Sequence, residues 1–214
     1  MAAVCILDEF EVHKNEKFLK TAERLKPGLH EKLVRPQNLQ VLDKKQFKRN
    51  DQVVLDFGDH QVGYVTLGLS SAGSHQDAPA YIYLRFAERI EELGADPAEY
   101  DGWISKSWIQ EEYIHVDVLP AELSLPRRYA FRYLEIKVID VSMKFSVVVD
   151  DVYVKAVSSV CQDDISPLKM EDPLLRKVDH VAIRTLQNCM QDVFEDGPKR
   201  DRRLWLGDFR QVGS

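Results

Sequence analysis

The segment Tyr129-Ala-Phe-Arg-Tyr-Leu-Glu-Ile-Lys-Val-Ile139 carries the clearest secondary-structure signal in the chain. In its second half Leu, Ile and Val alternate with Glu and Lys, so apolar and charged side chains fall on opposite sides of an extended backbone. This period of two predicts a β-strand with one buried face and one wetter face.

Segments of similar β-branched and aromatic composition lie on both sides of this strand. They cover residues 53–57, 61–69, 80–86, 107–118 and 145–154. Turn signals interrupt them, such as Gly58-Asp59 and Ser70-Ser-Ala-Gly-Ser74. At least six short strands with no helical pattern between them predict a mainly β fold, an antiparallel, jelly-roll-like β-sandwich.

The pattern changes after Ser166-Pro167. Asp172-Pro173 is typical of a helix N-cap followed by proline in the first turn, and it predicts a helix over residues 172–194. The apolar positions then recur at the helical period, at Leu174, Leu175, Val178, Val181, Ala182, Leu186, Cys189, Met190 and Val193. This stripe is too broad for one packing surface, so we expect partner helices, or self-association through the exposed helix 172–194.

These patterns divide the chain into three parts. Residues 1–48 are charged and weakly patterned and form a lead-in segment, residues 49–160 form the β-sandwich domain, and residues 161–214 begin a helical domain. We expect that helical domain to be incomplete, and the chain to be a fragment, because the helix lacks partners.

Composition excludes several classes of function. The formal net charge is −6, and only residues 199–203 are densely basic, which argues against a nucleic-acid partner. The sequence has no secretory leader pattern and no apolar window long enough for a membrane span. The three cysteines lack metal-site spacing and fit reduced thiols. We therefore expect a soluble, cytoplasmic protein.

The most unusual composition lies in Asp196-Gly-Pro-Lys-Arg-Asp-Arg-Arg-Leu-Trp-Leu-Gly-Asp208. Three carboxylates, four cationic groups and a tryptophan follow directly on the apolar helical stretch. Such a density suits a sugar-sized polar site better than a packed core. The alternative is a solvated linker held by salt bridges, as charge runs usually are.

This cluster resembles the active-site signature of the α-L-rhamnosidases, family 78 of the glycoside hydrolases, and of related six-hairpin glycosidases. The family pattern is roughly Asp-x-Pro-x-Arg-Asp-Glu-x-x-x-Trp-x-Gly-Asp. Asp172-Pro-Leu-Leu175 is similar to the opening helix of the family's (α/α)6 barrel, and Val54-Leu-Asp-Phe-Gly58 and Phe131-Arg-Tyr133 are similar to the preceding β-sandwich. The resemblance implies a β-sandwich followed by the first helix of a truncated barrel, a carbohydrate substrate, and neither cofactor nor metal.

The same resemblance implies roles for five residues. Asp196, Arg200 and Trp205 bind the sugar, while Asp201 and Asp208 are the catalytic carboxylates. A glycosidase needs such carboxylates, because one protonates the leaving oxygen and another attacks or activates water. The implied catalytic base lies on a later barrel helix, beyond this chain.

The sequence departs from the family at one position. The family's general acid is a glutamate directly after the second aspartate of the pattern, and here that position is Arg202. Arginine stays protonated and cannot donate a proton usefully. We therefore assign the acid to Asp201, as in a related subfamily with different specificity.

Two other readings remain open. The β-sandwich alone could be a non-catalytic carbohydrate-binding module, or the chain could be an inactive truncated product. Trp103 and Trp108 could form a carbohydrate platform, although tryptophan in strands more often belongs to the core.

For several other polar residues we expect no functional role. His60 and His115 have no second ligand at metal spacing, so we expect no metal site there. We expect Glu88, Glu91 and Glu92 to be surface charges.

Overall fold

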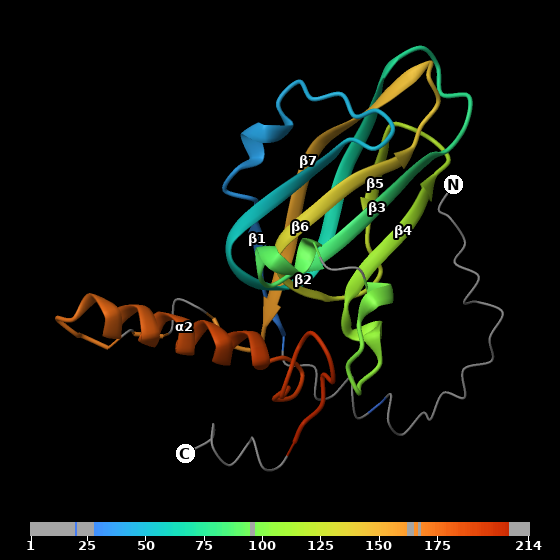
Figure 1. Cartoon of the computed structure of the whole chain (residues 1–214). Coiled ribbons are helices and arrows are strands. Elements are labelled where there is room, and N and C mark those ends of the chain that lie inside the picture. Colours follow the sequence, from blue (N-terminus) through green and yellow to red (C-terminus); the bar gives the residue numbers. More distant parts are fainter. Residues whose placement is uncertain (1–19, 21–27, 95–96, 162–164, 167, 206–214) are drawn as a thin grey trace.

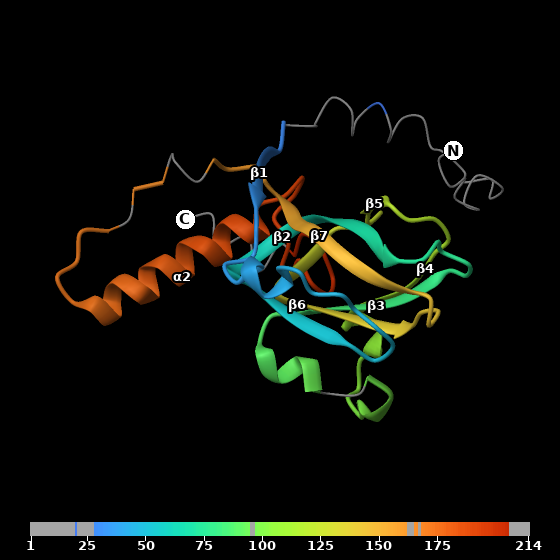
Figure 2. The same ribbon diagram turned by 90° about the horizontal axis from the view of Figure 1, so that it is seen from above.

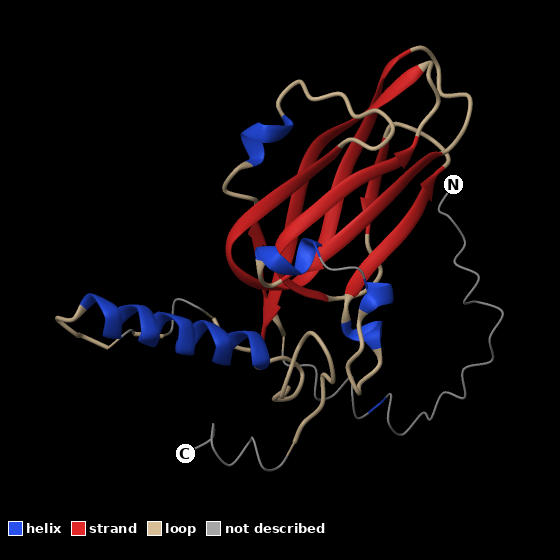
Figure 3. Ribbon diagram, in the orientation of Figure 1, coloured by secondary structure: helices blue, strands red, loops and turns tan. Residues whose placement is uncertain are grey.

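The computed structural model of the 214-residue chain describes residues 20, 28–94, 97–161, 165–166 and 168–205. The fold is mainly β, with a seven-stranded antiparallel sheet followed by one α-helix (Figure 1 and Figure 3). The strands are β1 (His30–Val34), β2 (Gln52–Gly73), β3 (Ala80–Ala87), β4 (Gln110–Val116), β5 (Ala121–Ser124), β6 (Tyr129–Asp140) and β7 (Phe145–Ser158). The helices are α2 (Pro173–Cys189) and the 3-10 turns η2 (Leu39–Leu42), η3 (Ile90–Gly94), η4 (Pro97–Glu99) and η5 (Lys106–Trp108).

The strand order is β1-β7-β2-β6-β3-β4, with β5 paired to β2. The long strand β2 belongs to both halves of this sheet, since its first half pairs with β6 and its second half with β7 and β5. Seen from above, β7 and the second half of β2 face β6 and β3 across the core (Figure 2). This arrangement is consistent with the predicted β-sandwich, and we call residues 30–158 the β-domain.

Gly63 lies where β2 passes from one half to the other. It is paired with Tyr129 of β6 and with Ala156 of β7. A Cβ at this position would collide with the main chain of Lys155. Glycine therefore permits the close approach of three strands at this point.

The core fills the space between the two halves. Phe86 stacks on Tyr129 with ring centroids 3.9 Å apart, and Phe57 meets Phe131 edge to face. Phe47, in the predicted lead-in segment, is fully buried and bridges Val147 of β7. Burial of each such side chain contributes roughly 1.5–3 kcal/mol, so the segment before β2 also stabilises the β-domain.

Several predicted boundaries were wrong. Residues 53–57 and 61–69 are parts of the single strand β2, because the chain passes Gly58 with a left-handed φ of 80° and a register shift rather than a turn. Strand β4 begins at Gln110, and η5 precedes it. Strands β1 and β5 were not predicted.

The start of α2 was predicted correctly and its end was not. The Asp172 side chain accepts a hydrogen bond from the main-chain N–H of Leu174 at 2.7 Å, and Pro173 opens the helix. The helix ends at Cys189 rather than at residue 194, because Met190 forms a bridge with Phe194 and the chain turns back. Among the described residues, no helix combines the length and apolar character that a membrane span needs.

Helix α2 contacts the β-domain through its polar side. Arg184 Nε donates to Asp59 Oδ2 at 2.9 Å, and Asn188 Nδ2 lies 2.8 Å from His60 Nδ1. The apolar side chains of the first turns point to solvent, with Val178 58% and Val181 60% exposed. Within the described part of the chain, the predicted apolar stripe is therefore uncovered in the first turns of the helix and partly buried near its end, at Leu186, Cys189 and Met190.

Candidate functional site

A cavity of about 450 Å³ lies where the C-terminal segment meets the β-domain. Its lining comes from η5, from the start of β4, from the turn before β6 and from residues 196–202, which we call the motif loop. The lining residues are Ile104, Ser105, Trp108, Gln110, Arg127, Lys199, Arg200, Asp201 and Arg202. Its volume lies in the range of small-molecule sites.

The motif loop is a tight turn. The main-chain N–H groups of Arg200 and Arg202 both donate to the carbonyl of Gly197, at 3.2 and 3.0 Å. The N–H of Asp196 donates to the carbonyl of Arg203 at 3.0 Å, which closes the turn. Arg202 has a left-handed φ of 53°, a conformation that a non-glycine residue adopts only when its surroundings hold it there.

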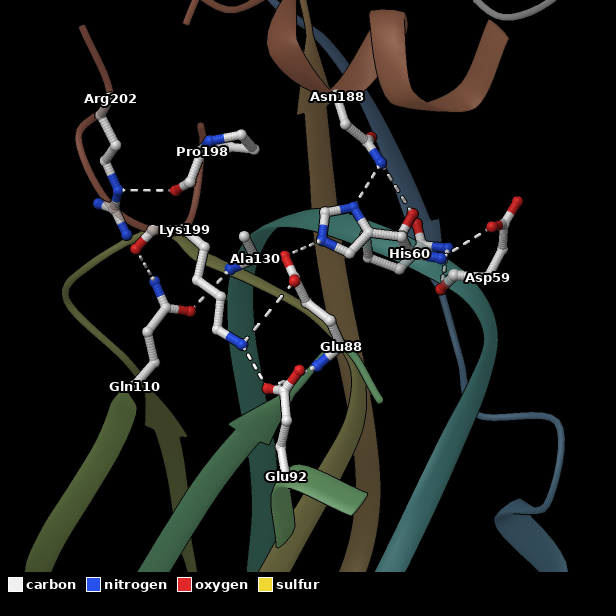
Figure 4. A network of polar contacts seen from close by, with 11 residues as sticks. Asp59, His60, Glu88, Glu92, Gln110, Ala130, Asn188, Pro198, Lys199 and Arg202 are labelled. Atoms are coloured by element: carbon white, nitrogen blue, oxygen red, sulfur yellow. Dashed lines mark hydrogen bonds and ion pairs between the residues drawn. The ribbon is translucent and has the colours of Figure 1, made fainter. Parts of the chain in front are cut away.

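Lys199 attaches the loop to the β-domain. Its ammonium group lies 2.6 Å from Glu92 Oε2 and 4.0 Å from Glu88 Oε2 (Figure 4). The same group also lies over the Trp108 ring, 5.3 Å from its centroid. The side chain of Gln110 donates to the Lys199 carbonyl at 3.3 Å and accepts from the main chain of β6. Loop and β-domain are thus joined through both the side chain and the main chain of Lys199.

Glu88 continues this network toward α2. Its Oε1 lies 3.1 Å from His60 Nε2, and the other ring nitrogen of His60 contacts Asn188 (Figure 4). Burial raises the pKa of Glu88, but the hydrogen bond with His60 and the charges of Lys199 and His60 outweigh it and leave that pKa lowered. A continuous set of polar contacts therefore joins the motif loop, the β-domain and α2.

Arg202, the last residue of the motif loop, also holds the loop in place. Its Nε donates to the carbonyl of Pro198 at 2.9 Å, and its Nη2 donates to the carbonyl of Arg128 at 2.6 Å. Burial lowers the pKa of its guanidinium, and the positive charges of Arg128 and Arg127 lower it further, against the opposing charge of Glu195. At the position where a glutamate was expected, the chain thus has a structural cation.

Asp201 and Arg200, two of the predicted site residues, lie together at the cavity. Asp201 Oδ1 is 2.8 Å from Arg200 Nε, and Asp201 Oδ2 accepts a hydrogen bond from Arg200 Nη2 at 3.1 Å. This two-point ion pair leaves the Asp201 side chain about a quarter exposed. Asp201 is the one carboxylate that lines the cavity within the described part of the chain.

Two other predicted site residues, Asp196 and Trp205, are not brought to the cavity. Asp196 does not line it, although its Oδ1 is buried and has no hydrogen-bond partner among the described residues. Trp205 is 48% exposed and also does not line it. Asp208 lies outside the described residues.

On the β-domain side of the cavity, Arg127 was not predicted, and Trp108 was considered only together with Trp103, as a possible carbohydrate platform. Arg127 lines it while pairing with Glu112 at 2.7 Å, and Trp108 lines it next to Tyr100. Neither residue has a local motif, so only the strand pairing that brings η5 and the turn before β6 together could have revealed them. Trp103 projects into solvent with 94% of its surface exposed.

The glutamates predicted as surface charges are exposed or partly exposed, while the metal prediction stays untested. Glu88 is 41% and Glu92 31% exposed in the side chain, and both also face the ammonium group of Lys199. Within the described ranges, no group of three or more His, Cys, Asp or Glu side chains is arranged to hold a metal ion.

Comparison with known proteins adds to this geometry. Residues 20–156 match the model of the glycosyl hydrolase family 78 alpha-rhamnosidase N-terminal domain. A rhamnosidase from Klebsiella oxytoca, solved with rhamnose bound, is 42% identical with a TM-score of 0.83, over 92% of this chain and 42% of that chain. A GH78 family rhamnosidase of Bacillus sp. GL1 shares the fold, with 20% identity and a TM-score of 0.58, over 76% of this chain and 15% of that one.

The chain thus spans less than half the length of these two rhamnosidases. No curated protein sequence matches it.

Proposed function

This chain belongs to glycosyl hydrolase family 78, and we propose that it forms the N-terminal portion of an α-L-rhamnosidase that hydrolyses O-glycosidic bonds. The observation that carries this proposal is the pairing of Asp201 with Arg200 at a sugar-sized cavity closed by the β-domain. In this proposal the boundary between the β-domain and the helical part lies near residue 160.

The motif loop supplies one part of the chemistry. A glycosidase places two carboxyl groups on either side of the scissile bond, about 5–5.5 Å apart in retaining enzymes and about 6.5–9.5 Å apart in inverting ones. We assign the general acid to Asp201. Arg202 cannot take that role, because a guanidinium does not release its proton. The catalytic base comes from a segment of a longer protein, and Asp196, Arg200 and Trp205 bind sugar.

Asp201 has both oxygens engaged by Arg200 in the ligand-free chain. Asp201 must therefore give up part of this ion pair and take up a proton before it can protonate a leaving-group oxygen. We expect the chain by itself to bind sugar without hydrolysing it, since a second carboxylate does not line the cavity within the described residues.

The test is a chimera in which this chain replaces the matching part of the Klebsiella oxytoca rhamnosidase. We expect the chimera to hydrolyse 4-nitrophenyl α-L-rhamnoside, whereas the isolated chain does not. A folded chimera that binds rhamnose but shows no hydrolysis would contradict the proposal. Hydrolysis by the isolated chain, abolished by Asp201→Asn, would contradict the assignment of the base to another segment.

A second substrate tests the role of Asp201 in the chimera. If Asp201 is the acid, Asp201→Asn slows substrates with poor leaving groups far more than activated aryl rhamnosides, because only poor leaving groups need a proton. The matched control is Asp192→Asn, an exposed aspartate just before the motif loop. Equal losses on both substrate types would show that Asp201 is structural.

The presence of one carboxylate at the cavity favours a second candidate, a carbohydrate-binding module without catalysis. This reading predicts sugar binding by the chain and an inactive chimera. The two candidates therefore differ in one measurement, the hydrolysis rate of the chimera.

We also propose a cytoplasmic location. Cys161 and Cys189 are both free thiols, which suits a reducing compartment.

A further inference from the structure

The cavity at the motif loop is lined by more cationic than anionic side chains. Four of its lining side chains carry a positive charge, namely Arg127, Lys199, Arg200 and Arg202, against the single carboxylate of Asp201. A neutral sugar needs few of these charges. Their number calls for an explanation beyond hydroxyl binding.

The partners of these cations show which charges are already balanced. Lys199 is neutralised by Glu92, Arg200 by Asp201, and Arg127 by Glu112. Arg202 differs, because its described hydrogen bonds go to the main-chain carbonyls of Pro198 and Arg128. Within the described residues it forms no ion pair.

The guanidinium of Arg202 also lies close to other positive charges. Burial and the neighbouring charges of Arg128 and Arg127 lower the pKa of its guanidinium, and the opposing charge of Glu195 only partly offsets them. A cation that is partly buried beside other cations is stabilised by any anion that enters the same space. Arg127 and Arg200 are each 46% exposed in their side chains, so both can turn toward such an anion.

We propose that the cavity binds an acidic saccharide, with a uronic acid carboxylate placed between Arg202, Arg127 and Arg200. Guanidinium groups suit this task, because their planar donors match the two oxygens of a carboxylate. Asp201 accepts hydrogen bonds from the sugar hydroxyls. The choice of a saccharide over a simple anion rests on the proposed function, and the carboxylate preference rests on the charges of the cavity.

The test compares three small ligands by calorimetric titration of the chain at low salt. D-Galacturonate and D-galactose have the same ring configuration and differ at C6, and acetate supplies the carboxylate without the ring. We expect galacturonate to bind at least ten times more tightly than either of the others, with an affinity that falls as salt is added. Equal binding of galacturonate and galactose, equal binding of galacturonate and acetate, or no binding of any ligand would each overturn the proposal.

Variants of the cavity residues test whether the preference for galacturonate arises in the cavity. Arg127→Gln and Arg202→Gln should each weaken galacturonate binding at least fivefold while leaving galactose binding unchanged, and Arg202→Lys should retain part of the preference. Because Arg202 also fastens the motif loop, Arg127→Gln tests the proposal if Arg202→Gln fails to fold. The control is Arg49→Gln, an exposed arginine that pairs with Asp140 away from the cavity. Unchanged galacturonate binding in Arg127→Gln would overturn the proposal.

Failure of this inference and failure of the proposed function are distinguishable. A chimera that hydrolyses the neutral rhamnoside, together with a chain that does not prefer galacturonate, would refute the acidic ligand alone. An inactive chimera, together with a clear galacturonate preference, would refute the hydrolase and leave the acidic saccharide as ligand of a binding module.

Discussion

The ammonium group of Lys199 lies 2.6 Å from the carboxylate of Glu92, and the pair joins the motif loop to the turn after β3. Lys199 is almost fully buried, whereas Glu92 is about a third exposed. The contact therefore falls between a surface ion pair, which stabilises little, and a fully buried one, whose loss is costly.

Lys199→Met should lower the free energy of unfolding by roughly 1–2 kcal/mol, because it leaves the Glu92 carboxylate partly buried without its cation. Denaturant titration measures this change. Lys144→Met, which removes the exposed pair with Asp77, is the matched control and should leave the free energy of unfolding nearly unchanged. If Lys199→Met costs no more than Lys144→Met, the motif loop is not anchored by this contact.

Arg202→Glu restores the residue expected from the family pattern and should nevertheless destabilise the chain. The change removes the hydrogen bonds to the carbonyls of Pro198 and Arg128, at a cost of about 1–3 kcal/mol. Arg203→Glu, at the exposed neighbouring position, should be nearly neutral. Equal melting temperatures for the two variants would show that Arg202 does not hold the loop.

Asp59→Asn should loosen the docking of α2. Burial raises the pKa of Asp59, but the hydrogen bonds from Arg184, from the main chain of His60 and from His180, together with the Arg184 charge, leave it below the ordinary value of 3.8. A lowered folded-state pKa stabilises the structure above the unfolded value, and this stabilisation is lost as the pH falls through the folded-state pKa.

We therefore expect Asp59→Asn to cost about 1 kcal/mol at pH 7, after allowance for solvent screening, and this cost to disappear as the pH falls below the lowered folded-state pKa of Asp59. Hydrogen exchange of the α2 amides measures the docking, and Asp192→Asn is the exposed control. A pH-independent difference between Asp59→Asn and the parent chain would rule out the charge as the cause.

The uncovered face of α2 should cause self-association of this chain. Leu174, Val178 and Val181, in the first turns of the helix, are each more than half exposed. Val178→Lys combined with Val181→Glu should raise the monomer fraction in sedimentation. The control replaces two other exposed apolar residues, Val118→Glu and Met143→Lys. A chain that stays monomeric at high concentration with or without the α2 changes would refute this prediction.

The sequence predicted strands well where both faces had a distinct chemistry. The alternation in β6 and the β-branched run in β7 were both recognised, because burial of one face imposes that pattern. Strand β1 was missed, because its residues His30–Val34 are largely charged and exposed at the sheet edge. The break expected at Gly58 was also wrong, because a bulge can bend a strand without ending it.

Only the part of the candidate site that the motif loop forms could be predicted from the sequence. The motif loop is continuous in sequence, so its composition indicated Asp201 and Arg200 as neighbours. Trp108 and Arg127 reach the cavity through the pairing of distant strands, which no local pattern encodes. The structural role of Arg202 was equally hidden, because it depends on a carbonyl supplied by Arg128, far away in the chain.

The shared strand β2 has a consequence for how the molecule folds. Neither half of the β-domain has a complete set of hydrogen-bonded neighbours without β2, so neither half can be stable while the other is disordered. The contacts that close the structure also join residues far apart in sequence, such as Gly63 and Ala156. Such non-local pairing is slow to form, so the β-domain should fold late and in one cooperative step, only after β7 has been synthesised.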